Sequence, residues 1–287
     1  MNYHRMKYLS KNLIHVCGIN RSGQHAISAL LLGTCHKAIY KNNTGKDKTG
    51  NAQFALDKRF KHSGFNYQLF VDGKRNREYG INMITDQMPV DLFIIGSENV
   101  TPKGLKNGQR AFIKNSNALL KKIGSDRMSE NEKIVFVIRS PWNHIASSMF
   151  WRGKNHFVNN PEKFVPAWNA IAQETLRMTN YLPKNKFVPI LFDKWYDDIE
   201  YRKQLCKLLN MDFNDKNKNV ILGYGKGSTF QRTNNGQKLN IKNRWEKCLR
   251  NETHTKKLID MLTYDPQTLE MSEKLFGELP EGIKALL

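Results

Sequence analysis

The chain has 287 residues, of which 39% are hydrophobic and 10% aromatic, a composition that argues against extensive disorder and allows one α/β core. Its formal net charge is +20, with 46 Lys and Arg against 26 Asp and Glu. Such a charge predicts an anionic partner, for example a nucleotide, a sulfated or carboxylated glycan or a nucleic acid, unless the lysines only keep the chain in solution.

The first pattern along the chain is an apolar run, then a polar turn between two glycines, then a helical segment. Leu13–Cys17 predicts a strand, and Gly18 and Gly23 bound the turn. This layout is typical of phosphate-binding loops, in which amides at a helix N-terminus hold an anion. The Lys-Ser/Thr pair of nucleotide triphosphatase loops is replaced by Gln24 and His25. The loop therefore predicts an anion site that lacks the groups for the outer phosphates of ATP and for magnesium.

Between residues 41 and 88 the chain is rich in Lys, Asn, Gly and Asp and has weak periodicity. We expect loops and small β pieces there, lying over the ligand cleft. The next strand is predicted at Asp91–Gly96, and a weaker one at Ala111–Lys114. Glu98 follows the first of these strands, at the edge where open α/β sheets bind ligands. It is a candidate general base, and a solvated loop glutamate is the alternative interpretation.

A further apolar run, Lys133–Arg139, predicts a buried parallel strand, and Pro141–Phe150 predicts the helix that follows it. Arg139 ends the strand, and Ser147 lies about two turns into the helix. The two side chains could therefore converge on one phosphate. The simpler interpretation is a strand-end salt bridge and a hydroxyl on a helix face.

The remaining elements alternate between helix and strand, as in a parallel sheet with helices on both faces. The other predicted elements are one strand, Lys186–Phe192, and four helices, Gln24–Thr34, Pro161–Tyr181, Asp197–Asn210 and Thr255–Phe276. Pro266 should break or kink the last helix. Residues 214–242 form a second loop-rich tract, with Lys226, Gly227 and Ser228 in a glycine-rich stretch.

These elements predict a single α/β domain over residues 1–287, with a P-loop-like three-layer fold in which helices flank a central parallel sheet. The four cysteines form no C-x-x-C pair, so reduced thiols are expected rather than a zinc site. The polar N-terminus and the short apolar run after it match neither a signal peptide nor a membrane anchor. We therefore expect a cytoplasmic protein without a membrane anchor.

The anion loop and the strand–helix segment together resemble the sulfotransferase family, which uses 3′-phosphoadenosine 5′-phosphosulfate (PAPS). In that family a Pro-Lys/Arg-Ser-Gly-Thr loop cradles the 5′-phosphosulfate, and a later Arg-x-Pro-x-x-x-x-x-Ser pattern binds the 3′-phosphate. The first pattern corresponds here to Asn20-Arg21-Ser22-Gly23-Gln24. The second runs from Arg139 to Ser147. The family also has a late Gly- and basic-rich loop, often followed by an Arg-Trp pair, and residues 223–229 and 244–245 are similar to these.

The resemblance implies a set of residues that bind PAPS: Asn20, Arg21, Ser22, Gly23, Gln24, His25, Arg139, Ser147, Lys226, Gly227 and Ser228. It also implies catalytic roles for Arg21, which would stabilise developing charge, for Glu98 as general base, and for His25, which could contact the sulfuryl group. The acceptor would be a hydroxyl or amine of a small molecule or glycan, which could itself be anionic. The desulfated nucleotide PAP would be the product, and neither a metal nor a nucleic-acid partner is expected.

Two positions depart from the family pattern. Ala26 or a neighbour stands where cytosolic members have the tryptophan that stacks on adenine, and Arg21 stands where the best-known members have lysine. Other interpretations stay open: a degenerate P-loop phosphotransferase that needs ATP and magnesium, a basic nucleic-acid-binding protein without catalysis, and an inactive nucleotide binder. The acceptor cannot be read from the sequence, and we expect Lys41–Met88 and Trp151–Asn160 to determine it.

Overall fold

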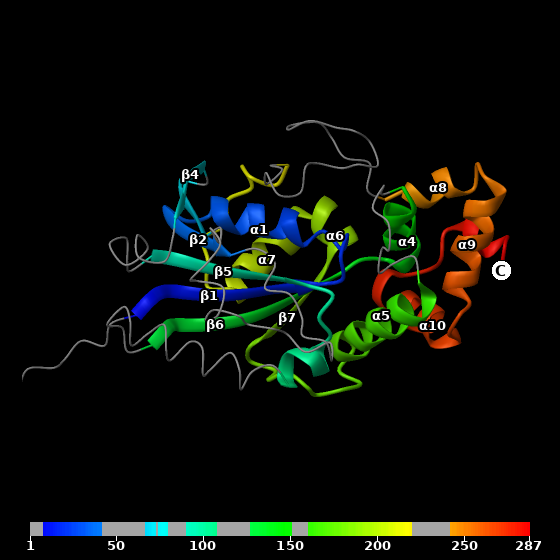
Figure 1. Ribbon diagram of the computed structural model, residues 1–287, viewed down its shortest axis with the longest axis horizontal. Helices are drawn as coiled ribbons and strands as arrows, with labels where there is room; N and C mark the ends of the chain where they lie inside the picture. The colour runs from blue at the N-terminus through cyan, green and yellow to red at the C-terminus, as the bar shows by residue number, and fades with distance from the viewer. Residues whose placement is uncertain are drawn as a thin grey trace, which may run out of the picture.

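The computed structural model describes residues 8–41, 67–72, 74–79, 90–107, 127–150, 160–219 and 242–287. Within these residues a seven-stranded sheet has the order β4-β3-β2-β5-β1-β6-β7 (Figure 1). The strands are β1 Tyr8–Gly18, β2 Lys37–Lys41, β3 Tyr67–Val71, β4 Lys74–Tyr79, β5 Val90–Glu98, β6 Arg127–Ile138 and β7 Phe187–Leu191.

Five neighbouring strands, from β2 through β5, β1 and β6 to β7, pair in parallel, whereas β3 and β4 are antiparallel. The register sets the functional edge of the sheet: Gly18 is paired with Glu98 in β5 and with Val137 in β6. Because all five strands point the same way, the residues that follow β1, β5, β6 and β7 meet at one edge.

The helices of the described segments cover both faces of the sheet and extend beyond its carboxyl edge (Figure 1). They are α1 Gln24–Gly33, α4 Pro141–Met149, α5 Pro161–Thr175, α6 Phe192–Asp197, α7 Ile199–Leu208, α8 Arg244–Cys248, α9 Glu252–Leu262, α10 Pro266–Phe276 and α11 Glu281–Lys284. A short helical segment also spans residues 102–107.

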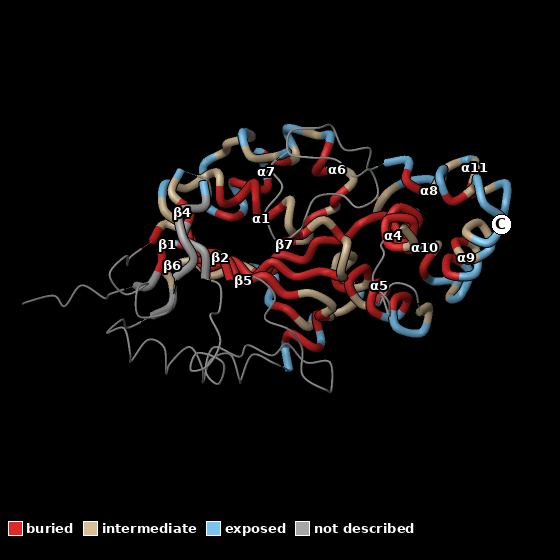
Figure 2. The backbone as a smooth tube through the Cα atoms, turned by 45° about the horizontal axis from the view of Figure 1, so that its top comes forward, coloured by how far each residue is buried: buried red, intermediate tan, exposed pale blue. Residues whose placement is uncertain are grey.

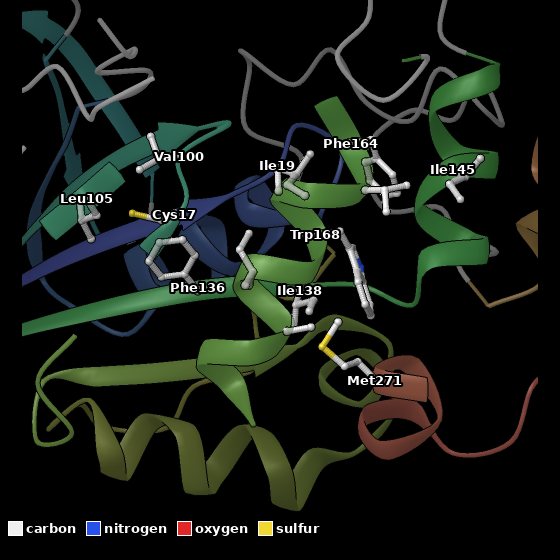
Figure 3. Close-up of a cluster of buried hydrophobic side chains, with 14 of the residues drawn as sticks. Cys17, Ile19, Val100, Leu105, Phe136, Ile138, Ile145, Phe164, Trp168 and Met271 are labelled. Carbon is white, nitrogen blue, oxygen red and sulfur yellow. The ribbon is translucent and has the colours of Figure 1, made fainter. Parts of the chain in front are cut away.

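Successive side chains along each strand point to opposite faces of the sheet, so the core has two layers. In β1, Ile14 and Val16 pack against α1, α6 and α7, whereas Leu13 and Cys17 face the side of α4, α5, α9 and α10. Figure 2 shows most of β1, β2, β5, β6 and β7, and the inward faces of the helices, in the red of buried residues. Figure 3 shows part of the second layer, where Ile138 lies near Trp168 of α5 and Met271 of α10. The predicted α/β three-layer fold is therefore confirmed.

Several predicted boundaries are wrong, and each has a local cause. The helix predicted as Pro161–Tyr181 ends at Thr175, because the buried Glu174 carboxylate accepts the amides of Tyr181 and Leu182 and the chain turns back. The strand predicted to reach Phe192 ends one residue earlier, because Phe192 begins α6.

The helix predicted as Asp197–Asn210 is α7, and the short α6 before it was not predicted, whereas the segment predicted as Thr255–Phe276 is divided into α9 and α10. Asp198 separates α6 from α7 by accepting the Tyr201 amide at 2.8 Å as a helix cap. Pro266 begins α10 after α9 ends at Leu262, which confirms the predicted break. β2 was not predicted, the hairpin β3–β4 agrees with the β pieces expected in residues 41–88, and the weak strand Ala111–Lys114 lies outside the described residues.

Candidate functional site

The loop between β1 and α1 turns tightly, with one arginine and one glycine at positive φ. Arg21 has φ 73° and Gly23 has φ 106°, in the left-handed region. A Cβ at Gly23 would lie 2.3 Å from the ring of Phe192, and one at Gly18 would lie 2.5 Å from the hydroxyl oxygen of Ser22. The two glycines therefore permit a tight turn that lies directly against the first residue of α6.

Side chains from outside the loop hold its backbone on both flanks. The backbone N–H of Asn99 donates to the Gly18 carbonyl at 2.8 Å. The backbone N–H of Asn20 donates to the side-chain oxygen Oδ1 of Asn99 at 2.9 Å. On the other flank, Nε2 of the buried His144 on α4 donates to the Asn20 carbonyl at 2.8 Å. The loop is therefore fixed relative to the end of β5 and to α4.

Two loop side chains bury polar atoms in this turn. Ser22 is fully buried and Gln24 is 3% exposed. The Ser22 hydroxyl and both polar atoms of the Gln24 amide make no hydrogen bond within the described part of the chain. Buried polar groups are normally hydrogen-bonded, so these groups fit a polar ligand at the N-terminus of α1.

Three arginines from distant parts of the chain share this region: Arg21 of the loop, Arg139 at the end of β6, and Arg244 at the start of α8. Arg139 and Arg244 are only 2% and 5% exposed. The guanidinium of Arg139 lies 5.4 Å from the ring centre of Phe192, and Nη1 of Arg244 donates to the Ser147 hydroxyl at 2.7 Å. Arg244 therefore connects α8 to the helix that follows Arg139.

Burial acts against the charge of these arginines. It is the main cause that lowers the pKa of Arg139 to about 10, with a further decrease from Arg21 and an opposing increase from Asp193. Burial also lowers the pKa of Arg244 well below its usual value, and the charges of Arg139 and Arg21 add to this effect. The pKa of Arg21 is lowered by burial as well, while Glu98 raises it. Buried cations this close together favour an anion between them.

One carboxylate lies beside the arginines. Oδ2 of Asp193 accepts the Ser140 amide at 2.8 Å, and Oδ1 accepts the Ser140 hydroxyl at 3.0 Å and the Asn143 amide group at 3.1 Å. Oδ1 of Asn143 in turn accepts the Arg244 backbone amide at 3.1 Å. The N-terminus of α4 and the start of α8 are therefore joined through Asp193 and Asn143.

The two candidate acid–base residues lie in contact with each other. Nε2 of His25 is 3.3 Å from Oε1 of Glu98, and Nδ1 is 3.3 Å from the hydroxyl oxygen of Tyr40 on β2. The second carboxylate oxygen of Glu98 accepts the Asn20 side-chain amide at 3.3 Å. Glu98 is thus attached to the anion loop through both oxygens.

The structure gathers most of the predicted residues at the carboxyl edge of the sheet: Asn20, Arg21, Ser22, Gly23, Gln24, His25, Glu98, Arg139 and Ser147. Lys226, Gly227 and Ser228 lie outside the described residues. Sequence reasoning did not assign site roles to Asn99 or Asp193, and it noted Arg244 only as part of an Arg-Trp pair. The position of Asp193 directly after a buried strand, like that of Glu98, was the signal that could have found it.

The fold and this edge define the chain as an α/β protein with a candidate anion site, lined by arginines, after the first strand of its sheet. Among the residues described, no helix is both long and apolar enough to cross a membrane. Over the same residues, no group of three or more His, Cys, Asp or Glu is arranged to hold a metal ion. No model of a known protein family matches the sequence, and no curated protein matches it.

Three solved structures are similar over nearly the whole chain. The sulfotransferase domain of the olefin synthase from Synechococcus PCC 7002 is 13% identical with a TM-score of 0.43, and the match covers 95% of this chain and 97% of that one. Mouse sulfotransferase SULT7A1, complexed with PAP, is 11% identical with a TM-score of 0.44, covering 94% and 88%. The sulfotransferase domain from the curacin biosynthetic pathway is 13% identical with a TM-score of 0.45, covering 94% and 99%. At these values the likeness concerns the fold and carries no information on the reaction.

Proposed function

We propose that this protein transfers a sulfuryl group from PAPS to a hydroxyl or amine of a small-molecule or glycan acceptor. The observation that carries the proposal is the meeting of Arg21, Arg139 and Arg244 around the N-terminus of α1 and the hydroxyl of Ser147. PAPS has two anionic ends, and this edge of the sheet offers two groups of donors.

In this proposal the 5′-phosphosulfate lies on the loop Asn20–His25, where the amides of the first turn of α1 and the buried groups of Ser22 and Gln24 can donate to it. The 3′-phosphate lies among Arg139, Ser147 and Arg244. The sequence suggested Arg139 and Ser147 for this phosphate, and the structure adds Arg244 to them. Lys226, Gly227 and Ser228 are proposed to cover the nucleotide from the late loop.

The chemistry proposed is an in-line displacement at sulfur. The acceptor oxygen or nitrogen forms a bond to sulfur while the bond from sulfur to the bridging oxygen breaks, and the electron pair leaves with PAP. Negative charge grows on the bridging and sulfuryl oxygens, where the guanidinium of Arg21 and the loop amides can stabilise it. The acceptor proton passes to a general base.

Glu98 is the proposed general base, and His25 is the second candidate. Both lie at the end of the loop that would hold the sulfuryl group, and they are 3.3 Å apart. The contact allows His25 and Asn20 to orient the Glu98 carboxylate toward an acceptor.

The test is a thermal melt with PAP in EDTA beside ATP with magnesium, AMP with magnesium and adenosine with EDTA. PAP in EDTA should raise the melting temperature most, because a ligand at a hundredfold excess over its Kd stabilises by about 2.7 kcal/mol. A shift with ATP and magnesium but none with PAP would favour the phosphotransferase alternative and refute this proposal. The subsequent assay follows transfer of radiolabelled sulfate from PAPS to a panel of phenols, amines and glycans.

A further inference from the structure

The carboxylate of Asp193 lies where an anion would be expected to bind. It follows β7 at the carboxyl edge of the sheet, and its neighbour Phe192 lies under the Arg139 guanidinium. Asp193 accepts three hydrogen bonds, two from Ser140 and one from Asn143. Ser140 is the N-cap residue of α4, so this carboxylate occupies the end of the helix that attracts negative charge.

The same carboxylate is a counter-charge that acts on two of the buried arginines, Arg139 and Arg244. Arg139 directly precedes Ser140, and the Arg244 amide is bonded to the Asn143 side chain that donates to Asp193. The negative charge of Asp193 raises the pKa of both arginines, against the effect of their burial. This negative charge opposes the mutual repulsion between Arg139 and Arg244, which lowers the pKa of Arg244 further.

We propose that Asp193 is a positioning residue that substitutes for the bound anion: it holds Arg139 and Arg244 in place when the site is empty, and it keeps the anion away from the N-terminus of α4. The ligand class is a phosphate or sulfate ester with two negative charges. A dianion that binds between the arginines takes over the role of counter-charge and is repelled by the carboxylate that remains beside it. The site is thereby organised before the ligand arrives, at the expense of some affinity.

This inference rests on the proposed function only in requiring that a dianion binds at the arginines. It makes two predictions of opposite sign for a neutral side chain at position 193. The ligand-free protein becomes less stable, because the arginines lose their counter-charge. The affinity for the dianion rises, because a like charge near the ligand is removed. A residue that only supports the fold would lower both quantities.

The experiment compares Asp193→Asn with wild type by thermal melting without ligand and by calorimetric titration with inorganic phosphate and with PAP. We expect a lower melting temperature and at least about threefold tighter binding of the dianion. Ser140→Ala is the matched control, because it removes one hydrogen bond to the same carboxylate and leaves the charge in place. It should lower the melting temperature without tightening the binding. Asp260→Asn, on the exposed side of α9, changes the net charge equally and should leave both quantities unchanged.

Unchanged or weaker phosphate binding by Asp193→Asn overturns the inference. Asp193→Ser is the second neutral variant, since its hydroxyl can still accept a hydrogen bond from the Ser140 amide. Failure of both variants to fold, even in sulfate buffer, also overturns the inference. If wild type binds phosphate but not PAP, and Asp193→Asn binds phosphate more tightly, the proposed function fails and this inference stands. If wild type binds PAP and Asp193→Asn binds it more weakly, this inference alone fails.

Discussion

Gly23 shows how closely the anion loop approaches α6. Its φ is 106°, and a Cβ there would lie within 2.7 Å of three ring atoms of Phe192. Gly277 also has a positive φ, 82°, but a Cβ at that position would have no atom within 4 Å. The two glycines therefore differ in packing, and they also differ in backbone conformation, because ψ is 7° at Gly23 and −167° at Gly277.

We expect Gly23→Ala to lower the free energy of unfolding by about 3 kcal/mol, as measured in urea, because the new methyl group meets the Phe192 ring at a positive φ that alanine rarely adopts. A second substitution isolates the contact with Phe192. In the background of Gly23→Ala, replacing Phe192 by Leu should recover part of the loss. If Gly23→Ala costs as much in the Phe192→Leu background as in wild type, the contact with the ring contributes nothing to the loss.

Arg139, Ser147 and Arg244 are proposed to hold the 3′-phosphate, and a ligand without this group tests their role. Arg139→Ala and Arg244→Ala should each weaken PAP binding by about tenfold or more, because a charged hydrogen bond contributes roughly 1.5–3 kcal/mol. Binding of adenosine 5′-phosphosulfate, which lacks the 3′-phosphate, should change much less. Lys247→Ala, which removes a positive charge from the same helix as Arg244, is the control.

Calorimetry with both ligands measures these affinities. Because Arg244 and Ser147 are hydrogen-bonded at 2.7 Å, the losses in Arg244→Ala and Ser147→Ala should not add in the double variant. Equal weakening of the two ligands would assign the residues to another part of the nucleotide.

At the residue scale, spacing along the chain could identify only what is local. Arg139 and Ser147 are eight residues apart on one strand and the following helix, so their proximity was predictable. Arg244 is 97 residues from the Ser147 hydroxyl that it contacts, and Asp193 is 53 residues from Ser140. Contacts at such separations depend on strand order and helix packing, which a single sequence does not specify.

At the scale of elements, β1 and β6 are joined by an ionic cluster as well as by their ladder. Nε2 of the buried His15 lies 3.3 Å from Oε1 of Glu132, and Nζ of Lys186 lies 2.6 Å from Oε2. Contact with His15 is the main cause that lowers the pKa of Glu132 to about 2, and Lys186 adds to the effect. The ionised carboxylate is therefore favoured by the folded state.

A carboxyl group whose pKa is lower in the folded state than in the unfolded chain stabilises the fold at any pH above its unfolded pKa. This stabilisation is lost as the pH falls toward the pKa of the group in the folded state. Glu132→Gln should therefore cost on the order of 1–2 kcal/mol at pH 7, a range reduced for partial exposure of the pair. The difference from wild type should shrink between about pH 4.5 and 2. Urea unfolding across this range measures it, with the exposed Glu130→Gln on the same strand as control. A difference that does not depend on pH would assign Glu132 a role without charge.

The elements that the sequence predicted best are the long apolar strands, because burial on both faces leaves a continuous apolar run in β1, β5 and β6. Helix ends were predicted less well. The end of α5 depends on Glu174, whose carboxylate accepts the Thr179 hydroxyl as well as two backbone amides. β2 has five residues and lysines at both ends, which gave no strand pattern, and its place beside β5 is a tertiary effect.

At the scale of the whole molecule, the candidate site is assembled from segments spread over more than 200 residues, from the loop after β1 to α8. A ligand that bridges them should stabilise all of them together. We expect PAP to slow amide hydrogen exchange in residues 19–25, 139–149 and 242–248 at the same time. The antiparallel strands β3 and β4 lie at the far side of the sheet and should be unaffected. Protection limited to one of the three segments would contradict a site shared among them.

The two outermost described strands of the sheet, β4 and β7, affect how readily copies of the chain aggregate at high concentration. An edge strand presents amides and carbonyls that can recruit a strand from another molecule, the first step of edge-to-edge aggregation. β4 reads Lys-Arg-Asn-Arg-Glu-Tyr, and β7 contains Pro189, which cannot donate a backbone hydrogen bond. The sequence of β4 has three basic residues and one acidic residue, so a second copy of this strand carries the same net positive charge. Both described edges thus discourage growth of the sheet, and we expect the folded chain to resist fibril seeding even at high concentration.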